Sequence, residues 1–427
     1  MQKLRLKNEN LSVSHILFVL LIVFSIIPSI GIKFVTAGFT WTAYRLVCAL
    51  VVIYTVFEVK ALYVEKGKFC SKWIVFLTIW VVYGTILLFV ARYSVFHSGF
   101  IECLSLLNGL ITLFFLSRQL SSEYNRYVAI RLIYWALNVM LFVGIIEILT
   151  GWHLSSSKFS DVASYGNVVN NHLATGFMYN ENDFSAMLTC LTPVLIDRRL
   201  GKKRLFTIAG VMLVNLINDA ATCVFAICAF AGYYLLVLRG GKSYKAIILK
   251  LFLGAIALCS IALFLFTGIS FSNRNDMLGS VARTISGVHM ASGSLYRRFS
   301  MYTDGIVAWR STGMLGMGPG GFTNYFVKHG SVSGLTNPHA FLIEILTQYG
   351  IVILLWFVFL LSYMFRSANK KYHATSGDEQ KQVLMVIAFT IIYFVISFAP
   401  SSFIGYSYPW MLIALMCSQL DYGLDFG

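Results

Sequence analysis

One loop of this chain is rich in arginine and glycine and lies between two hydrophobic segments. It runs roughly from residue 269 to 340. Its charged residues are six cations and two anions: Arg274, Arg283, Arg297, Arg298, Arg310 and Lys328, with Asp276 and Asp304. Guanidinium groups bind phosphates through paired hydrogen bonds, and clustered cations attract anions. The pattern indicates that the loop binds an anion such as a phosphorylated lipid head group.

Residues 295–312 of this loop have the spacing of an amphipathic helix. Arg298, Tyr302, Gly305 and Trp309 recur at i, i+4, i+7 and i+11, so they share one helical face. Arg310 projects about 120° away around such a helix. Because a straight helix cannot aim both arginines at one phosphate, we expect Arg298 to be the main contact. The alternative is an interfacial helix whose arginines extend toward lipid head groups.

A glycine-rich turn, Gly316-Met-Gly-Pro-Gly-Gly321, follows this helix. Glycine permits positive φ and a close backbone approach, and successive N–H groups in such a turn can surround an anion. Gly318 and Gly320 are therefore candidate substrate-binding positions. The alternative is a plain helix C-cap and turn.

Asn337-Pro338-His339 has the pattern of a helix start, and the helix it predicts runs through Glu344 toward Gly350. Asparagine is a favoured N-cap and proline a favoured first residue, which places His339 in the first turn beside unpaired N–H groups. Such a helix end attracts phosphate, and histidine can exchange a proton near neutral pH. Asn337 and His339 are thus candidate site residues. A structural histidine is the alternative.

The elements that must position these residues are membrane-spanning helices. Of 427 residues, 58% are hydrophobic and 12% charged, with a mean hydropathy of +0.75. This composition is typical of an all-α, polytopic membrane protein, which we treat as one transmembrane domain. Hydrophobic windows predict twelve spans, at 14–32, 38–57, 73–91, 99–117, 128–150, 183–197, 205–218, 220–238, 246–267, 345–366, 383–399 and 405–419.

The loops that carry lysine and arginine predict the orientation of the spans. Cytoplasmic loops are enriched in these residues, and one threading places the basic loops at 60–72, 118–131, 198–204, 239–245 and 366–381 on that side. Both termini are then cytoplasmic, and the long loops 151–182 and 269–340 lie outside. The net charge of +15 follows mostly from this topology, so it does not indicate a nucleic-acid partner. The first span lacks a small-residue cleavage site, and we interpret it as a retained helix.

No metal or cofactor motif occurs in the sequence. The eight cysteines lie in predicted spans or a cytoplasmic loop, without a CxxC pair. Neither long outer loop contains an Asp-x-Asp pair, so we expect no divalent metal and no cofactor.

Several motifs together resemble the superfamily of O-antigen ligases and Wzy-type polysaccharide polymerases. The signature loop of that superfamily is similar to the glycine turn with Phe322, followed by Asn337-Pro-His-Ala-Phe-Leu-Ile-Glu344 and Gln348-Tyr-Gly-Ile351. The stretches Arg298–Gly305 and Tyr179-Asn-Glu-Asn-Asp-Phe184 resemble members that build teichuronic acid and other surface polysaccharides. The motif matches cover 180–184 and 294–351, and the span count and loop placement agree across the chain.

The resemblance implies a GT-C-like, metal-independent glycosyltransferase at the outer face of the bacterial cytoplasmic membrane, with short helices in its large outer loop. Its substrate would be an undecaprenyl-diphosphate-linked oligosaccharide. Arg298 matches the arginine that contacts the lipid diphosphate, and His339 matches the essential histidine, a diphosphate contact or general base. The sequence departs from the pattern at Asn218–Thr222, where many members carry a second arginine. Arg283, Arg297 or Arg310 would have to replace it, or the contact is absent.

The remaining candidate binding residues are Asn182, Asp183 and Tyr302, and Asp183 or Glu181 is a second choice as proton acceptor. We favour a polymerase that joins repeat units, with a chain-length regulator and a flippase of the same pathway as possible partners. A ligase that transfers glycan to another acceptor is the alternative. A lipid-linked sugar flippase is a third hypothesis, which predicts charged residues inside spans and broken helices.

Overall fold

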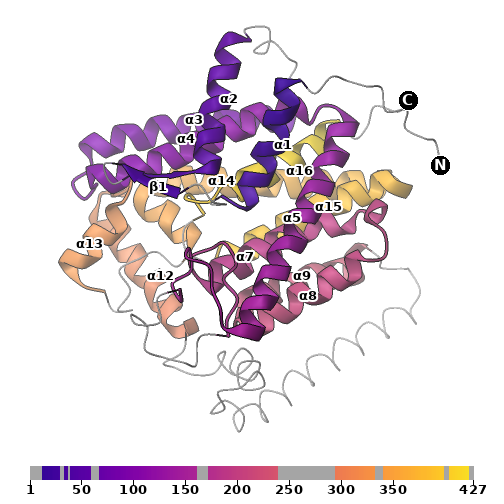
Figure 1. Ribbon diagram of the computed structural model, residues 1–427. Helices are drawn as coiled ribbons and strands as arrows, with labels where there is room; N and C mark the ends of the chain where they lie inside the picture. Colours follow the sequence, from indigo (N-terminus) through magenta and orange to yellow (C-terminus); the bar gives the residue numbers. More distant parts are fainter. Residues whose placement is uncertain are drawn as a thin grey trace.

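The computed structural model describes residues 12–28, 33–36, 39–58, 67–160, 172–238, 294–331, 340–398 and 403–422. These residues are mostly helical (Figure 1). The one sheet among them is a hairpin of two antiparallel strands, β1 Lys33–Thr36 and β2 Phe39–Thr42, in which Lys33 pairs with Thr42. The all-α prediction is therefore correct for the bundle. The span predicted at 38–57 is wrong at its start, because β2 precedes its helix.

Within the described ranges, six helices are long and apolar enough to cross a membrane. They are α3 Lys68–Val90, α4 Phe96–Gln119, α5 Glu123–Thr150, α9 Ala221–Tyr233 with its π-helical extension to Leu238, α14 Phe341–Ala374 and α15 Gly377–Ile396. Three shorter apolar helices are α1 Val13–Ile26, α2 Ala43–Phe57 and α8 Arg204–Ile217. Two more, α7 Glu181–Leu191 and α16 Tyr408–Asp421, also coincide with predicted spans. The span predicted at 246–267 lies outside the described residues, so the count of twelve crossings stays a prediction.

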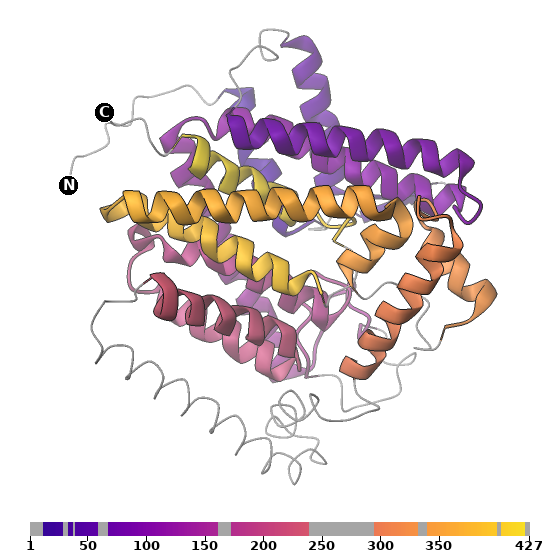
Figure 2. The ribbon, with the colours of Figure 1, turned by 180° about the vertical axis from the view of Figure 1, so that it is seen from behind.

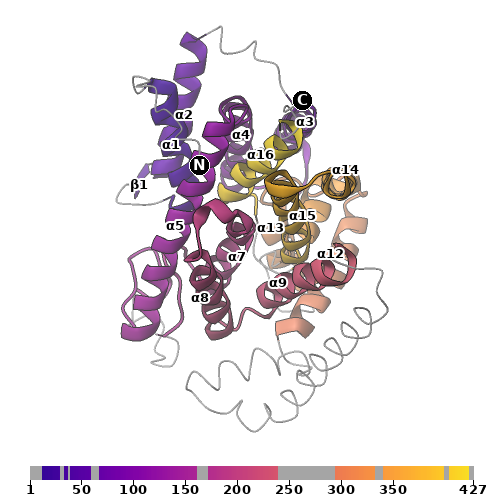
Figure 3. The ribbon, with the colours of Figure 1, turned by 90° about the vertical axis from the view of Figure 1, so that its right-hand side faces the viewer.

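The centre of the bundle is formed by α7, α15 and α16. Nearly every residue of α7 and α16 is buried, as are most residues of α15 from Val383 onward, and α1, α3, α4, α5, α9 and α14 lie around them (Figure 3). Close packing supplies much of the association between apolar helices in lipid. A Cβ at Gly109 would lie 2.7 Å from the Trp410 ring, so this glycine lets α4 approach α16. Trp80 of α3 completes the contact, with its ring centroid 6.1 Å from that of Trp410.

The outer surface of the bundle carries many large apolar side chains. Phe57 is 83% exposed, and Phe89, Leu149, Phe206 and Val352 are also exposed. Surfaces of this kind are unfavourable in water and favourable in lipid. Together with the six long apolar helices, they indicate a multi-pass membrane protein.

Helix α14 is broken at Gly350, where φ is 79° and ψ is 175°. The break separates a short buried segment, 341–349, from the long segment 351–374. The helix begins at Phe341 with Ala340 as its N-cap, so the predicted start at Asn337 with His339 in the first turn is wrong. The reason is tertiary: the N–H of Leu342 donates to the Ser397 carbonyl oxygen of α15 at 3.3 Å, in place of a local side-chain cap.

Two further helices of the basic loop pack against the short segment of α14. They are α12 Ser294–Ser311 and α13 Gly321–His329, and α12 matches the predicted helix 295–312. Met301, Ala308, Phe322 and Ile343 belong to a separate hydrophobic cluster that joins α12, α13 and α14. Figure 2 shows α12 and α13, in orange, gathered at one end of α14. This part of the loop therefore has a core of its own.

Replacement of Gly350 by alanine tests the importance of the break. Its backbone conformation is essentially restricted to glycine, and such strain costs about 1–3 kcal/mol. In addition, a Cβ at Gly350 would lie 2.8 Å from the carbonyl oxygens of Met314 and Leu315. We expect Gly350→Ala to lower the thermal unfolding midpoint in detergent. Gly330→Ala is the control, because Gly330 has similar angles, φ 74° and ψ 167°, but no neighbour within 4 Å. Equal losses in the two variants would contradict the account.

Candidate active site

Helix α12 is held against both α14 and α15. A Cβ at Gly305 would lie 2.5 Å from Cγ2 of Ile343, so the glycine allows α12 to approach the short segment of α14. One turn earlier, the Tyr302 hydroxyl donates to the Phe398 carbonyl oxygen at 2.7 Å. Position 298 lies one further turn back on the same helical face. The side chains of residues 294–299 are outside the described part, so the orientations of Arg297 and Arg298 stay predictions.

The far end of α12 is more open to its surroundings. Arg310 is exposed in the last turn, and the indole N–H of Trp309 donates to the Met314 carbonyl oxygen at 2.9 Å. Arg283, Asn337 and His339 lie outside the described residues. Because α14 has Ala340 as its N-cap, His339 immediately precedes the short segment that α12 contacts.

The glycine turn docks on the break in α14. The N–H groups of Met317 and Gly318 donate to the carbonyl oxygens of Thr347 and Gln348 at 2.8 and 3.0 Å. A helix leaves its last carbonyl groups unpaired, and here the turn supplies their donors. Gly316 has φ 108°, and a Cβ there would lie 2.4 Å from the Gln348 oxygen. Only glycine allows this approach.

A carboxylate from α4 fixes the other end of the turn. Glu102 accepts the N–H of Gly320 at 2.9 Å and the hydroxyl of Tyr349, and it also bonds with the Gln348 side chain. The N–H groups of Gly318 and Gly320 thus already donate to protein oxygens. Their predicted role in binding the substrate stays a prediction. Sequence reasoning gave Glu102 no role, although a carboxylate inside an apolar span is itself a signal of a specific partner.

A second polar group lies at the start of α7. Asn180 caps this helix by accepting the Asp183 N–H at 2.8 Å, and its amide donates back to the Asp183 carboxylate at 2.6 Å. The Tyr406 hydroxyl is also hydrogen-bonded to Asp183, and burial together with this carboxylate raises the pKa of Tyr406 well above its usual value. Glu181 instead forms an ion pair with Lys158 at 2.6 Å, and the Asn182 amide donates to Glu181 at 3.4 Å. Of the two predicted proton acceptors, Asp183 is buried and Glu181 is half-buried.

The loop between α5 and α7 is tied down by two buried residues. Glu147 of α5 accepts the N–H groups of Thr175 and Gly176, both at 2.6 Å. Asn218, just after α8, exchanges hydrogen bonds of 2.8 Å with the backbone of Ala174. This asparagine stands where the resemblance would place a second arginine, and here it serves as a tether.

These elements meet at one end of the bundle. The ring of Phe341, which opens α14, lies 5.3 Å from that of Phe403 in the segment before α16. The end of α15 contacts α12 through Phe398 and α14 through Ser397. Within the described part of the chain, no group of three or more His, Cys, Asp or Glu residues is placed to hold a metal ion.

Removal of Glu102 tests whether it holds the glycine turn. In Glu102→Ala the Gly320 N–H and the Tyr349 hydroxyl lose their acceptor, and each buried donor left unpaired costs about 1–3 kcal/mol. We expect a lower thermal midpoint and faster hydrogen exchange at residues 316–321. Glu102→Gln retains an acceptor oxygen and should lose less. Glu58→Ala removes an exposed acid and is the control. Unchanged exchange in Glu102→Ala would rule out this role.

Comparison with known proteins shows a distant sequence similarity to a protein of polysaccharide biosynthesis. No protein-family model matches it. The chain is 21% identical over 370 residues to the teichuronic acid biosynthesis protein TuaE of Bacillus subtilis (strain 168). The match covers 82% of this chain and 71% of that protein. The chain is thus distantly similar, over most of its length, to a protein of polysaccharide biosynthesis.

Proposed function

We propose that the protein is a membrane glycosyltransferase that joins polyprenyl-diphosphate-linked oligosaccharide units at the outer face of the cytoplasmic membrane. One observation carries most of this proposal: the basic helix α12 packs directly on the short segment of α14 that His339 precedes. This packing, with the positions of Arg298 and His339 in the sequence, supports a shared site at the α12–α14 junction. The similarity to TuaE, a protein of teichuronic acid biosynthesis, supports a glycan substrate.

The chemistry requires few groups. A hydroxyl of the acceptor sugar attacks the anomeric carbon of the donor, a new C–O bond forms, and the bond to the diphosphate breaks. The electron pair of that bond leaves on the phosphate oxygen, and the hydroxyl proton passes to a base. Arg298, with Arg297 beside it, stabilises the charge that develops on the leaving group. His339 accepts the proton.

The contacts of the acidic residues favour His339 as the base. Asp183 already accepts hydrogen bonds from the Asn180 amide and from Tyr406, and only 3% of its surface is exposed. Glu181 is paired with Lys158. A carboxylate with such partners is a weaker base than a free one, because each partner stabilises its charged form.

One observation favours a second candidate, a transporter of lipid-linked sugars. The break in α14, the half-buried Glu102 and the buried carboxylates Glu147 and Glu344 are features that transporters place along substrate paths. However, the carbonyl groups at the break accept hydrogen bonds from the N–H groups of Met317 and Gly318. Glu147 likewise accepts hydrogen bonds from backbone N–H groups. These groups stabilise a packed structure, so we rank the transferase first.

A reconstituted assay distinguishes the functions. The purified protein in proteoliposomes receives one labelled lipid-linked oligosaccharide. A ladder of longer lipid-linked products supports a polymerase. Product that forms only with a second acceptor supports a ligase. Movement of the labelled lipid across the bilayer without any new glycosidic bond would overturn the proposal and support the transporter.

Arg298→Ala should reduce turnover by about 10²–10³-fold, the effect of losing one preorganised contact to developing negative charge. Lys328→Ala removes an equal charge from an exposed position of α13 in the same loop and should retain most of the activity. The measurement is the initial rate of oligosaccharide extension at saturating substrate, with thermal midpoints to verify folding. A wild-type rate in Arg298→Ala would show that this arginine is not the diphosphate contact.

A further inference from the structure

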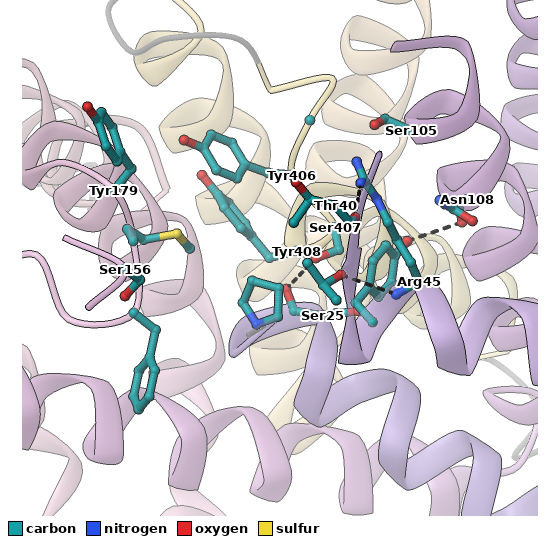
Figure 4. Close-up of a pocket in the computed structure, with 16 residues that line it drawn as sticks. Ser25, Thr40, Arg45, Ser105, Asn108, Ser156, Tyr179, Tyr406, Ser407 and Tyr408 are labelled. Atoms are coloured by element: carbon teal, nitrogen blue, oxygen red, sulfur yellow. Dashed lines mark hydrogen bonds between the residues drawn. The ribbon is translucent and has the colours of Figure 1, made fainter. Parts of the chain in front are cut away.

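A polar cavity of about 280 Å³ lies between five parts of the chain that are distant in sequence (Figure 4). It is bounded by the end of α1, the β2–α2 junction, the middle of α4, the loop before α7 and the segment leading into α16. Its volume is close to the lower limit of small-molecule sites, about 300–1,000 Å³. A cavity of this size suits a single sugar ring better than a long oligosaccharide.

The lining combines aromatic rings with hydroxyl and amide groups. Tyr406 and Tyr408 stack with ring centroids 5.8 Å apart, and Ser105 and Asn108 face the cavity from α4. Tyr179 lies at its edge and is 60% exposed. Aromatic faces pack against the C–H surface of a sugar, while hydroxyl and amide groups exchange hydrogen bonds with its hydroxyls. The lining therefore has the composition of a carbohydrate site.

The cavity also carries one positive charge. Arg45, in the first turn of α2, lines it, and one of its five N–H donors bonds to the Thr40 carbonyl oxygen. No aspartate or glutamate occurs among the described lining residues. Asp183, which is outside the lining, is hydrogen-bonded to Tyr406. Figure 4 shows Arg45 on one side of Ser407 and the two tyrosines on the other. One cation matches one carboxylate, whereas a diphosphate requires several.

We propose that this cavity binds one sugar residue of the acceptor glycan, and that this sugar carries a carboxylate, as a uronic acid does. Arg45 binds the carboxylate, Tyr406 and Tyr408 contact the ring, and Ser105 and Asn108 bond to its hydroxyls. That the sugar belongs to an acceptor glycan rests on the proposed function. That the cavity binds a sugar rests on the geometry of the cavity alone.

The cavity is connected to the α12–α14 junction by the segment 403–408. Phe403 of this segment contacts Phe341 at the start of α14. The residue that precedes Ala340 is His339, the proposed base. An acceptor held in the cavity thus lies in the neighbourhood of the proposed donor site.

The test is saturation-transfer NMR on the purified full-length protein in detergent, with glucuronate, glucose and inorganic phosphate as separate probes. We expect glucuronate to bind more tightly than glucose. Arg45→Gln should weaken glucuronate binding about tenfold, the effect of one charge-assisted hydrogen bond in a partly exposed site, and leave glucose binding nearly unchanged. Arg92→Gln, which removes an exposed arginine outside the lining, is the control.

Because Arg45 also bonds α2 to β2, its replacement could disturb folding. A second variant therefore tests the site with Arg45 in place. Asn108→Asp keeps the shape of the lining and adds a negative charge, so it should abolish the preference for glucuronate with Arg45 still present. Equal binding of the two sugars to the wild-type protein, or phosphate competition as strong as that of glucuronate, would overturn the proposal. A protein that binds glucuronate through Arg45 but joins no oligosaccharides would overturn only the proposed function.

Discussion

The break at Gly350 is the constraint on which the proposed site depends. It leaves carbonyl groups of the short α14 segment without helical partners in an apolar surrounding, where unpaired backbone groups are costly. Met317 and Gly318 supply the donors. The basic loop is thereby fixed to the bundle at a defined place, and α12, which precedes the turn, must lie along α14. A straight α14 would offer the loop no such attachment.

Three carboxylates in this protein hold irregular segments in place. The half-buried Glu102 binds the glycine turn, Glu147 binds the loop before α7, and the Asp183 carboxylate accepts the amide of Asn180, the N-cap of α7. Each is matched to N–H or hydroxyl donors, which is the arrangement that makes a buried charge tolerable. Glu147 and Asp183 lie in the last and first turns of their helices, and Glu102 in the second turn of α4, where irregular backbone brings donors within reach. Such contacts hold the loops in a defined position, as a site for positioned chemistry requires.

Long apolar runs made most helices predictable, and the spacing of Arg298, Tyr302 and Gly305 gave α12 nearly to its ends. The start of α14 could not be predicted, because Ser397 satisfies its first turn from another helix. The partners of Glu102 and the cavity around Arg45 were likewise hidden, since they join residues more than 200 positions apart. The roles of Arg298 and His339 came from motif resemblance, and their side chains lie outside the described part.

The central claim is that α12 and the start of α14 present an anion-binding site to the cell exterior. Thiol labelling of intact cells tests it most directly, with cysteine placed at position 298 or 339 and, as a cytoplasmic reference, at position 370. The account predicts that a membrane-impermeant maleimide labels positions 298 and 339 in intact cells and position 370 only after permeabilisation. Labelling of 298 and 339 only in permeabilised cells would contradict it.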